Sequence, residues 1–280
     1  MKIGLCLGGG GSRGYAHIGA IRALTEAGIK IDLVNGTSMG AIMGGMYALY
    51  MDVDEMTDRV RRATESGNVN HFNLFQHPKE GSSFLQNWLT EAICDMAALR
   101  KSIQSHKNNL KALRILLDEA RFEDTKIPFS AITMDIMTGK TTVIKKGKLI
   151  DGVLASASIP GIFPPVARSK KLLVDGFVLA NIPAPELRQQ GADFIISIGL
   201  EERPNKNFQN GVDLIYYVES IKQKQLDKWA IAESDFHINI EMTKFDATHF
   251  ENYEVAIKHG YNIAKKSMPL LVKKLEKINV

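Results

Sequence analysis

Cysteine is scarce in this 280-residue sequence, and no apolar run reaches transmembrane length. The two cysteines, Cys6 and Cys94, cannot form the disulfide framework of a small secreted protein, so we expect both to be buried thiols. Glycines interrupt the first apolar run, Ile3–Leu7, before it is long enough for a signal peptide. These absences predict a cytoplasmic protein, which would meet a lipid at a membrane surface or as a dispersed monomer.

A strong excess of one charge is also absent. The chain carries 35 basic and 31 acidic residues, a formal net charge of +4 at pH 7. A dedicated nucleic-acid-binding protein concentrates basic residues on one face, so we expect no nucleic-acid partner. The sequence shows no internal repeat, and its hydrophobic content of 45% is enough to bury the core of one domain over residues 1–280.

What the sequence does contain is an alternation of apolar runs and helical patterns. The strand-like runs are Ile3–Leu7, Ile31–Val34, Ile127–Met134, Lys171–Val174 and Phe194–Leu200. Because strands that alternate with helices usually pair in parallel, we predict an α/β fold with a mainly parallel central sheet flanked by helices. Residues 54–123 depart from this pattern with several charged helical stretches in succession, which indicates a helical cap inserted into the domain.

The end of the chain, from about residue 212 to residue 280, is predicted to be a C-terminal helical region around one strand. A long helical pattern covers about Val212–Glu233, a strand follows at Phe236–Met242, and a second helix starts near Glu251. Pro269 lies inside that second helix, where a proline removes a backbone hydrogen bond, so we expect the helix to kink or restart there.

A glycine-rich turn, Gly8–Gly14, follows the first strand and leads into a helical pattern. Glycine suits a backbone that lies against a ligand, and the free N–H groups at a helix start favour negative charge. Gly9, Gly11 and Gly14 fit the fingerprint of a dinucleotide site, although Asp32, the nearby candidate for the ribose acid, begins its strand rather than ending it. The other interpretations are close helix packing alone and an oxyanion hole for acyl transfer.

The nucleophile that an oxyanion hole requires follows the second apolar run. Gly36-Thr37-Ser38-Met39-Gly40 matches Gly-x-Ser-x-Gly between a strand and a helix, the context in which this motif forms a sharp turn that exposes the serine. Ser38 could instead be an ordinary N-cap of the following helix. Two glycine-rich turns on neighbouring parallel strands would meet at the carboxyl edge of the sheet, which favours the nucleophile.

A serine nucleophile needs a proton acceptor, and histidine is the usual one. None of the seven histidines follows a clear strand in a turn, so a histidine triad is kept as an alternative. Asp175 ends an apolar run and Gly176 follows it, which places a carboxylate at a strand end where the chain turns away. Asp175 is therefore the candidate base. A free aspartate has a pKa of about 3.9, so burial would have to raise it.

Together these motifs resemble the four ordered signatures of patatin-like phospholipases. The signatures are Gly9–Gly14, Gly36–Gly40, Ala155–Pro165 and Val174–Gly176. The resemblance implies a serine–aspartate dyad, in which Ser38 attacks the ester and Asp175 takes its proton. It also implies that the N–H groups of Gly9, Gly10 and Gly11 hold the oxyanion. The residues that support these motifs are Arg13, Gly14, Gly36, Gly40 and Gly176.

The resemblance further implies a fatty-acyl ester substrate, a phospholipid or a lysophospholipid, and neither metal nor cofactor. Two features depart from the family: Phe177 stands where Gly or Ala is usual, and the helical stretch Ala97–Glu119 is longer than typical. A protein that binds lipid without turnover is therefore kept as an alternative. The sequence indicates no oligomeric state.

Three smaller expectations concern charged residues. Arg13 is expected to hold the glycine loop through carbonyl oxygens, and Asp135 to be a turn residue before Thr138. A basic tail either contacts anionic lipid or is a solvated helix face; its members are Lys265, Lys266, Lys273, Lys274 and Lys277.

Overall fold

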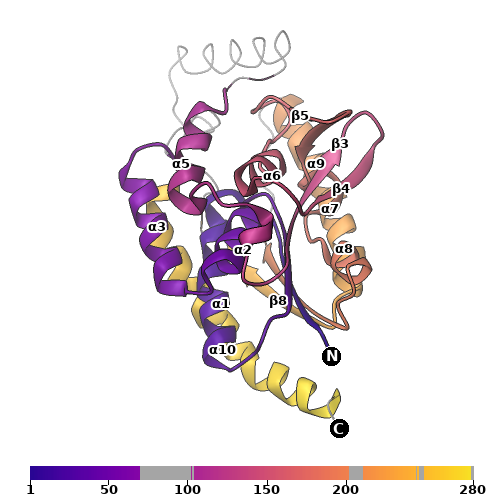
Figure 1. Ribbon diagram of the computed structural model, residues 1–280. Coiled ribbons are helices and arrows are strands. Elements are labelled where there is room, and N and C mark those ends of the chain that lie inside the picture. Colours follow the sequence, from indigo (N-terminus) through magenta and orange to yellow (C-terminus); the bar gives the residue numbers. More distant parts are fainter. Residues whose placement is uncertain (70–101, 103, 202–210, 244, 246–248, 279–280) are drawn as a thin grey trace, which may run out of the picture.

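The computed structural model describes residues 1–69, 102, 104–201, 211–243, 245 and 249–278, with only the backbone of 212, 213 and 216. These residues form an eight-stranded sheet with helices on both faces (Figure 1). The strands are β1 (Ile3–Leu7), β2 (Leu33–Thr37), β3 (Phe129–Asp135), β4 (Lys140–Ile144), β5 (Val166–Arg168), β6 (Lys171–Asp175), β7 (Phe194–Glu201) and β8 (Phe236–Glu241).

The sheet has a parallel centre and an antiparallel end. Its strand order is β5-β6-β3-β2-β1-β7-β8, and β4 pairs with β3. The pairs β1–β2, β1–β7, β2–β3 and β7–β8 are parallel, whereas β3–β4, β3–β6 and β5–β6 are antiparallel. This arrangement confirms the predicted α/β fold with a central sheet flanked by helices.

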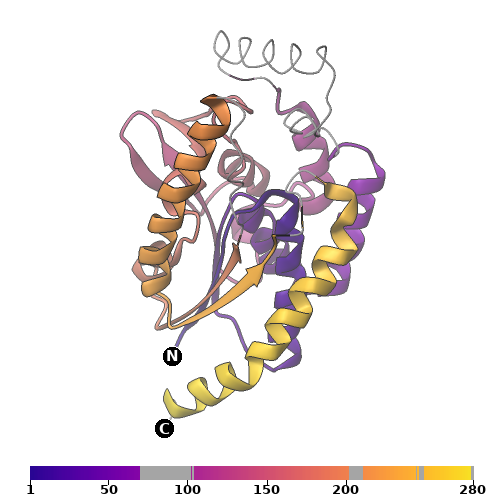
Figure 2. The same cartoon turned by 180° about the vertical axis from the view of Figure 1, so that it is seen from behind.

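Helices cover both faces of the sheet, so the central strands are buried on both sides (Figure 2). They are α1 (Ala16–Glu26), α2 (Met39–Tyr50), α3 (Val53–Glu65), α5 (Lys107–Leu117), α6 (Leu149–Ser156), α7 (Phe177–Ala180), α8 (Ala184–Gln189), α9 (Gly211–Ala232) and α10 (Tyr253–Ile278). Strand alternation divides the core: Leu5 and Leu7 join the large cluster under α1 and α2, whereas Cys6 joins a smaller cluster with α8. The predicted burial of Cys6 is confirmed, and burial raises the pKa of its thiol.

Two strands, β4 and β5, were not predicted from the sequence. Both lie in the antiparallel end, and both are short and partly exposed, with burial too irregular to leave a clear apolar alternation. Of the two outcomes expected at Pro269, a kink or a restart, the structure excludes the restart, because α10 continues through this proline without a break. Leu271 and Leu275 beyond it are buried, which holds the last turns of the helix on the core.

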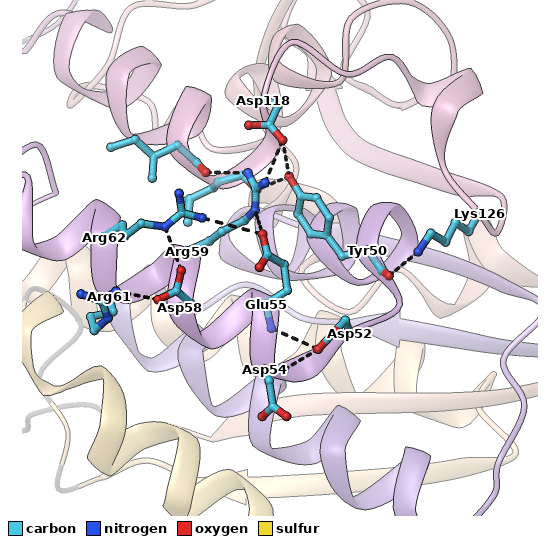
Figure 3. A network of polar contacts seen from close by, with 12 residues as sticks. Tyr50, Asp52, Asp54, Glu55, Asp58, Arg59, Arg61, Arg62, Asp118 and Lys126 are labelled. Carbon is cyan, nitrogen blue, oxygen red and sulfur yellow. Dashed lines mark hydrogen bonds and ion pairs between the residues drawn. The ribbon is translucent and has the colours of Figure 1, made fainter.

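The two described ends of the predicted cap pack on the main core. Helix α3 buries Met56 and Val60, and α5 buries Leu116. Polar contacts join these helices: the Arg59 guanidinium lies 2.6 Å from a Glu55 oxygen and 2.9 Å from an oxygen of Asp118, which follows α5 (Figure 3). Residues 70–101 and 103, with Cys94, lie outside the described residues, so the cap itself stays a prediction. None of the described helices is long and apolar enough to cross a bilayer.

Candidate active site

The carboxyl ends of β2 and β6 meet on one edge of β3. Strand β4 pairs with the carboxyl half of β3 and therefore occupies the opposite edge. On the shared edge, Thr37 of β2 is the partner of Ile132, and Asp175 of β6 is the partner of the next residue, Thr133. Because β2 and β6 run in opposite directions, Ser38 and Asp175 arrive at the same point of the sheet from opposite sides.

Ser38 occupies a strained turn at the start of α2. Its backbone has φ 56° and ψ −124°, a conformation that residues other than glycine rarely adopt. It stands at the N-cap position, but its side chain makes no capping hydrogen bond, so the ordinary N-cap interpretation is wrong. Gly40 must be glycine here, because a Cβ would clash with the carbonyl oxygen of Leu7, and Gly36 is constrained in the same way by Gly40.

The signature segment Ala155–Pro165 forms hydrogen bonds with both Ser38 and Asp175. The Ser156 hydroxyl accepts a hydrogen bond from the Ser38 N–H at 3.0 Å and donates to the Ile132 carbonyl at 2.6 Å. Two residues later, the Ser158 carbonyl accepts from the Asp175 N–H at 2.9 Å. The sequence showed this segment as a family signature, but it did not reveal these contacts, because their partners are far apart in the chain.

Asp175 is a fully buried carboxylate that is only half satisfied. Its Oδ1 accepts a hydrogen bond from the Phe177 N–H at 2.9 Å, whereas Oδ2 has no hydrogen-bond partner among the described residues. Burial raises the pKa of Asp175 to about 7, although the Ser38 side chain and the Phe177 N–H act in the opposite direction. The Ser38 hydroxyl is thus close enough to influence this carboxyl without a well-aligned hydrogen bond.

The residues after Asp175 fit the turn without strain. A Cβ on Gly176 would clash with the Ile132 carbonyl oxygen, so glycine is required at that position. Phe177 is the first residue of α7, and it is not among the described residues with positive φ. The departure from Gly or Ala at Phe177 therefore costs no backbone strain.

The glycine loop lies directly beside Ser38. A Cβ built on Gly9 would come within 3.2 Å of the Ser38 Cβ. The Arg13 guanidinium donates to the Gly10 carbonyl at 3.1 Å, as predicted, which holds the loop and the short helix η1 (Gly11–Tyr15) together. Gly11 has φ 58°, and Gly14 packs so closely on Met39 that a larger residue would displace it.

The amide of Gly9 is already engaged. Its N–H lies 3.1 Å from Asn181 Oδ1 and 3.3 Å from the Asn181 carbonyl oxygen. Asn181 Nδ2 in turn donates to Asp227 of α9 at 3.1 Å, and Gln223 donates to the same carboxylate at 3.0 Å. Burial raises the pKa of Asp227. Asn181 therefore links α9 to the glycine loop.

Sequence reasoning gave Asn181 no role. The only local signal was an asparagine six residues after Asp175 and two before a proline, in an otherwise apolar run. The same segment also contacts β2, because the Ala180 carbonyl accepts a hydrogen bond from the Thr37 hydroxyl at 2.7 Å.

The dinucleotide-binding alternative is wrong, because Asp32, the residue that would bind the ribose, lies far from the glycine loop. Asp32 accepts a hydrogen bond from the Ile3 N–H at 2.8 Å, at the amino ends of β1 and β2. The glycine loop lies at the carboxyl end of β1, so Asp32 is on the wrong side of the sheet to bind a ribose there.

The described histidines have other partners. His17 Nε2 bonds to the Gly8 carbonyl and burial lowers its pKa to about 4, while His106 bonds to Pro164. His237 bonds to Ser197, and burial likewise lowers its pKa to about 4. Within the described part of the chain, the hydrogen bonds of Ser38 and Asp175 thus involve no histidine. His71 and His77 lie outside the described residues.

Comparison with known proteins identifies the family of this chain. The sequence model of the family described as patatin-like phospholipase matches residues 5–188, which includes Ser38, Asp175 and the glycine loop. The chain belongs to the patatin-like phospholipase family. This confirms the resemblance found in the sequence and supports the enzyme class predicted with it, a lipid acyl hydrolase.

Related sequences belong to much longer proteins. The neuropathy target esterase sws of Drosophila melanogaster is 32% identical over 216 residues, which cover 76% of this chain and 14% of that protein. The patatin-like phospholipase domain-containing protein 6 of Mus musculus is 30% identical over 235 residues, covering 81% and 16%. The chain spans 14% to 25% of the length of the first curated relatives that it matches.

Two solved structures share the fold at low sequence identity. VipD from Legionella pneumophila has a TM-score of 0.52 at 16% identity, covering 96% of this chain and 66% of that one. Human GIVD cytosolic phospholipase A2 has a TM-score of 0.51 at 11% identity, covering 99% and 59%. Both support the arrangement of a central sheet between helices in the patatin-like phospholipase family.

Proposed function

We propose that this chain is a serine acyl hydrolase that cleaves fatty-acyl esters of phospholipids or lysophospholipids, with Ser38 as nucleophile and Asp175 as base. The observation that carries the proposal is a buried carboxylate with a free oxygen next to a serine on a strained turn. Buried polar groups are normally satisfied, so an unsatisfied one beside a nucleophile is typical of a catalytic group.

In the first step, the Ser38 Oγ attacks the acyl carbonyl carbon and its proton passes to Asp175 Oδ2. The electron pair of the carbonyl moves to its oxygen, which becomes the oxyanion of a tetrahedral intermediate. Collapse of this intermediate breaks the ester bond, and the departing alkoxide takes the proton from Asp175. A pKa of about 7 suits both transfers, because the carboxyl group must accept and release a proton near neutral pH.

In the second step, water attacks the acyl-serine ester while Asp175 accepts a proton from it. Collapse returns this proton to the Ser38 oxygen and releases the fatty acid. No redox change occurs, and each proton is accounted for by the two side chains and water.

The oxyanion requires N–H donors beside Ser38, and we propose Gly10 and Gly11 as the principal ones. Neither amide makes a backbone hydrogen bond outside η1 among the described residues. The Gly9 amide is bonded to Asn181, so its contribution would be to fix the loop rather than to meet the oxyanion directly. A preorganised donor of this kind lowers the barrier by about 3 kcal/mol.

A fluorophosphonate probe tests the proposal, because it forms a stable bond only with an activated serine. The GIVD phospholipase A2 structure holds such an inhibitor, which makes the probe a suitable choice here. We expect covalent labelling of the folded chain, loss of labelling in Ser38→Ala, and unchanged labelling in Ser220→Ala, a partly buried serine on α9. Absence of labelling in the folded wild-type chain would reject the proposal in favour of lipid binding without turnover.

A further inference from the structure

Two hairpins extend the sheet beyond Ser38 and Asp175. Strand β6 starts at Lys171 and ends at Asp175, so its first residue lies farther along the carboxyl direction of β3 than the catalytic pair. At about 3.3 Å per residue, the β3–β4 and β5–β6 turns reach roughly 13 Å past Asp175. We call residues 136–140 and 168–171 the tip; in Figure 1 it lies at the end of the molecule opposite the N-terminus.

Hydrogen bonds hold the tip in one shape. The buried Asp135 carboxylate accepts from the Met137 N–H at 3.2 Å, the Thr138 hydroxyl at 3.0 Å and the Leu172 N–H at 3.2 Å. This confirms the turn role predicted for Asp135. The Arg168 guanidinium also donates to the Lys146 carbonyl at 2.6 Å, which ties the second hairpin to the first.

The apex of the tip is apolar, although turns usually carry polar residues. Met137 is 71% exposed and Ile136 is 42% exposed. The side chains of these two residues do not form the turn, because its hydrogen bonds come from Asp135 and the backbone. Two exposed apolar side chains on a fixed turn are therefore available for contact with an apolar medium.

Exposed basic residues lie beside this apex, and the one carboxylate in the turn, Asp135, is buried. Residues 136–150 and 164–174 contain no aspartate or glutamate, whereas the whole chain has nearly as many acidic as basic residues. The basic residues of the tip, none of which forms an ion pair in the described structure, are Lys140, Arg168, Lys170 and Lys171. Lys145 and Lys146 follow the other end of β4 and lie away from the apex. The tip therefore carries a local concentration of positive charge, although the net charge of the whole chain is only +4.

We propose that the tip docks on the surface of an anionic bilayer, with Met137 and Ile136 inserted among the lipids and the surrounding lysines bound to their phosphates. An apolar apex beside exposed basic residues is the combination that binds such a surface, since burial of the apolar side chains and attraction of each cation to the lipid phosphates both favour binding. This proposal rests on the proposed function, because docking through the tip would turn the catalytic edge of the sheet toward the ester-bearing lipid.

The basic tail of α10 is the competing surface. Figure 2 shows that α10 ends near the N-terminus, at the opposite end of the molecule from the carboxyl ends of the parallel strands. Docking through Lys273 and Lys277 would therefore hold Ser38 away from the bilayer. The position of the tip beside the catalytic edge favours the tip.

Flotation with vesicles tests the proposal, and it should be done in the Ser38→Ala background so that turnover does not matter. We expect binding to phosphatidylcholine vesicles that contain phosphatidylglycerol, weaker binding without it, and a decrease with salt. Each lysine at an anionic surface contributes about fivefold in affinity, so K140Q/K170Q/K171Q should bind roughly a hundredfold more weakly. Met137→Ser should lose about tenfold, because it removes a buried apolar side chain.

The matched control is K266Q/K273Q/K277Q, which removes the same charge from exposed positions on α10 and should bind as the parent does. Equal losses in both triple variants, undiminished binding of the tip variant, or no preference for anionic vesicles would overturn the proposal. Melting temperatures check folding, and if the tip triple variant is unfolded, Lys170→Gln alone should still lose about fivefold. Labelling of Ser38 by a soluble fluorophosphonate is measured separately and reports on the proposed function alone.

Discussion

Buried charge is treated in opposite ways in two regions of this molecule. Around Arg59, a guanidinium that is 13% exposed bonds to Glu55, Asp118 and the Ile115 carbonyl, and lies over the Tyr50 ring (Figure 3). At Asp175, a fully buried carboxylate has one oxygen with no hydrogen-bond partner among the described residues. The first arrangement stabilises the packing of α3 against α5, whereas the second costs stability and, in the mechanism we propose, provides the base that accepts a proton.

The comparison teaches where chemistry is located in this fold. A compensated charge can be removed with loss of stability and little loss of activity, whereas the uncompensated one should show the reverse.

Replacing Asp175 by Asn should reduce kcat by at least about a thousandfold, because the amide cannot accept the serine proton. The measurement is hydrolysis of a soluble acyl ester, with Glu186→Gln as the matched control at a partly buried carboxyl group of α8 whose pKa burial also raises. Activity of Asp175→Asn comparable to that of the wild type would return the search to histidine.

The same substitution should stabilise the fold at alkaline pH. Folding raises the pKa of Asp175 from 3.8 to about 7, so the native state binds this proton more tightly than the unfolded state does. Wild-type stability should therefore fall as pH rises from about 4 to about 7, by at most about 4 kcal/mol.

Urea unfolding at two pH values tests this linkage. Near pH 8, Asp175→Asn should be more stable than the wild type, and the difference should shrink toward pH 4, where the carboxyl group is neutral in both states. If the difference in the free energy of unfolding between Asp175→Asn and the wild type is the same at both pH values, the pKa of Asp175 is not raised.

Asn181→Ala should lower kcat by about ten- to a hundredfold and leave KM nearly unchanged, since it frees the glycine loop without touching the acyl chain. Gln223→Ala provides the comparison, because it also removes a hydrogen bond to Asp227 but makes no contact with Gly9. A rise in KM alone in Asn181→Ala would indicate a binding role in place of loop positioning.

Arg59→Ala should lower the free energy of unfolding by about 1 to 2 kcal/mol, as expected for a mostly buried guanidinium with several charged or polar partners. Esterase activity should change little. Arg61→Ala, at a more exposed ion pair, should cost less than about 0.5 kcal/mol in the same urea experiment. A loss of activity without a loss of stability in Arg59→Ala would contradict the separation of the two regions.

The parts of the fold that could be predicted from the sequence are those encoded by neighbouring residues. Apolar runs in the sequence mark the strands β2 and β6. The turn at Ser38 and the turn at Asp175 each follow one of these runs. Strands β4 and β5 could not be found this way, because they are short, partly polar and held at the antiparallel end of the sheet by pairing with β3 and β6.

The arrangement of the site was predicted in outline and not in its contacts. Four signatures in order gave Ser38, Asp175 and the glycine loop as candidates, but not how the loop is held. The Gly9 amide bonds to a residue 172 positions away, and the Ser38 amide to one 118 positions away. Such contacts depend on strand order and register, which local spacing does not encode.

The pH dependence of kcat/KM on a soluble acyl ester would report directly on whether Asp175 is a buried base with a raised pKa. The wild type should show a single ionisation near pH 7, with activity falling about tenfold for each pH unit below it and a level region above. The residual activity of Asp175→Asn should lack this ionisation. A wild-type profile with no ionisation near pH 7, or the same ionisation in Asp175→Asn, would contradict the account.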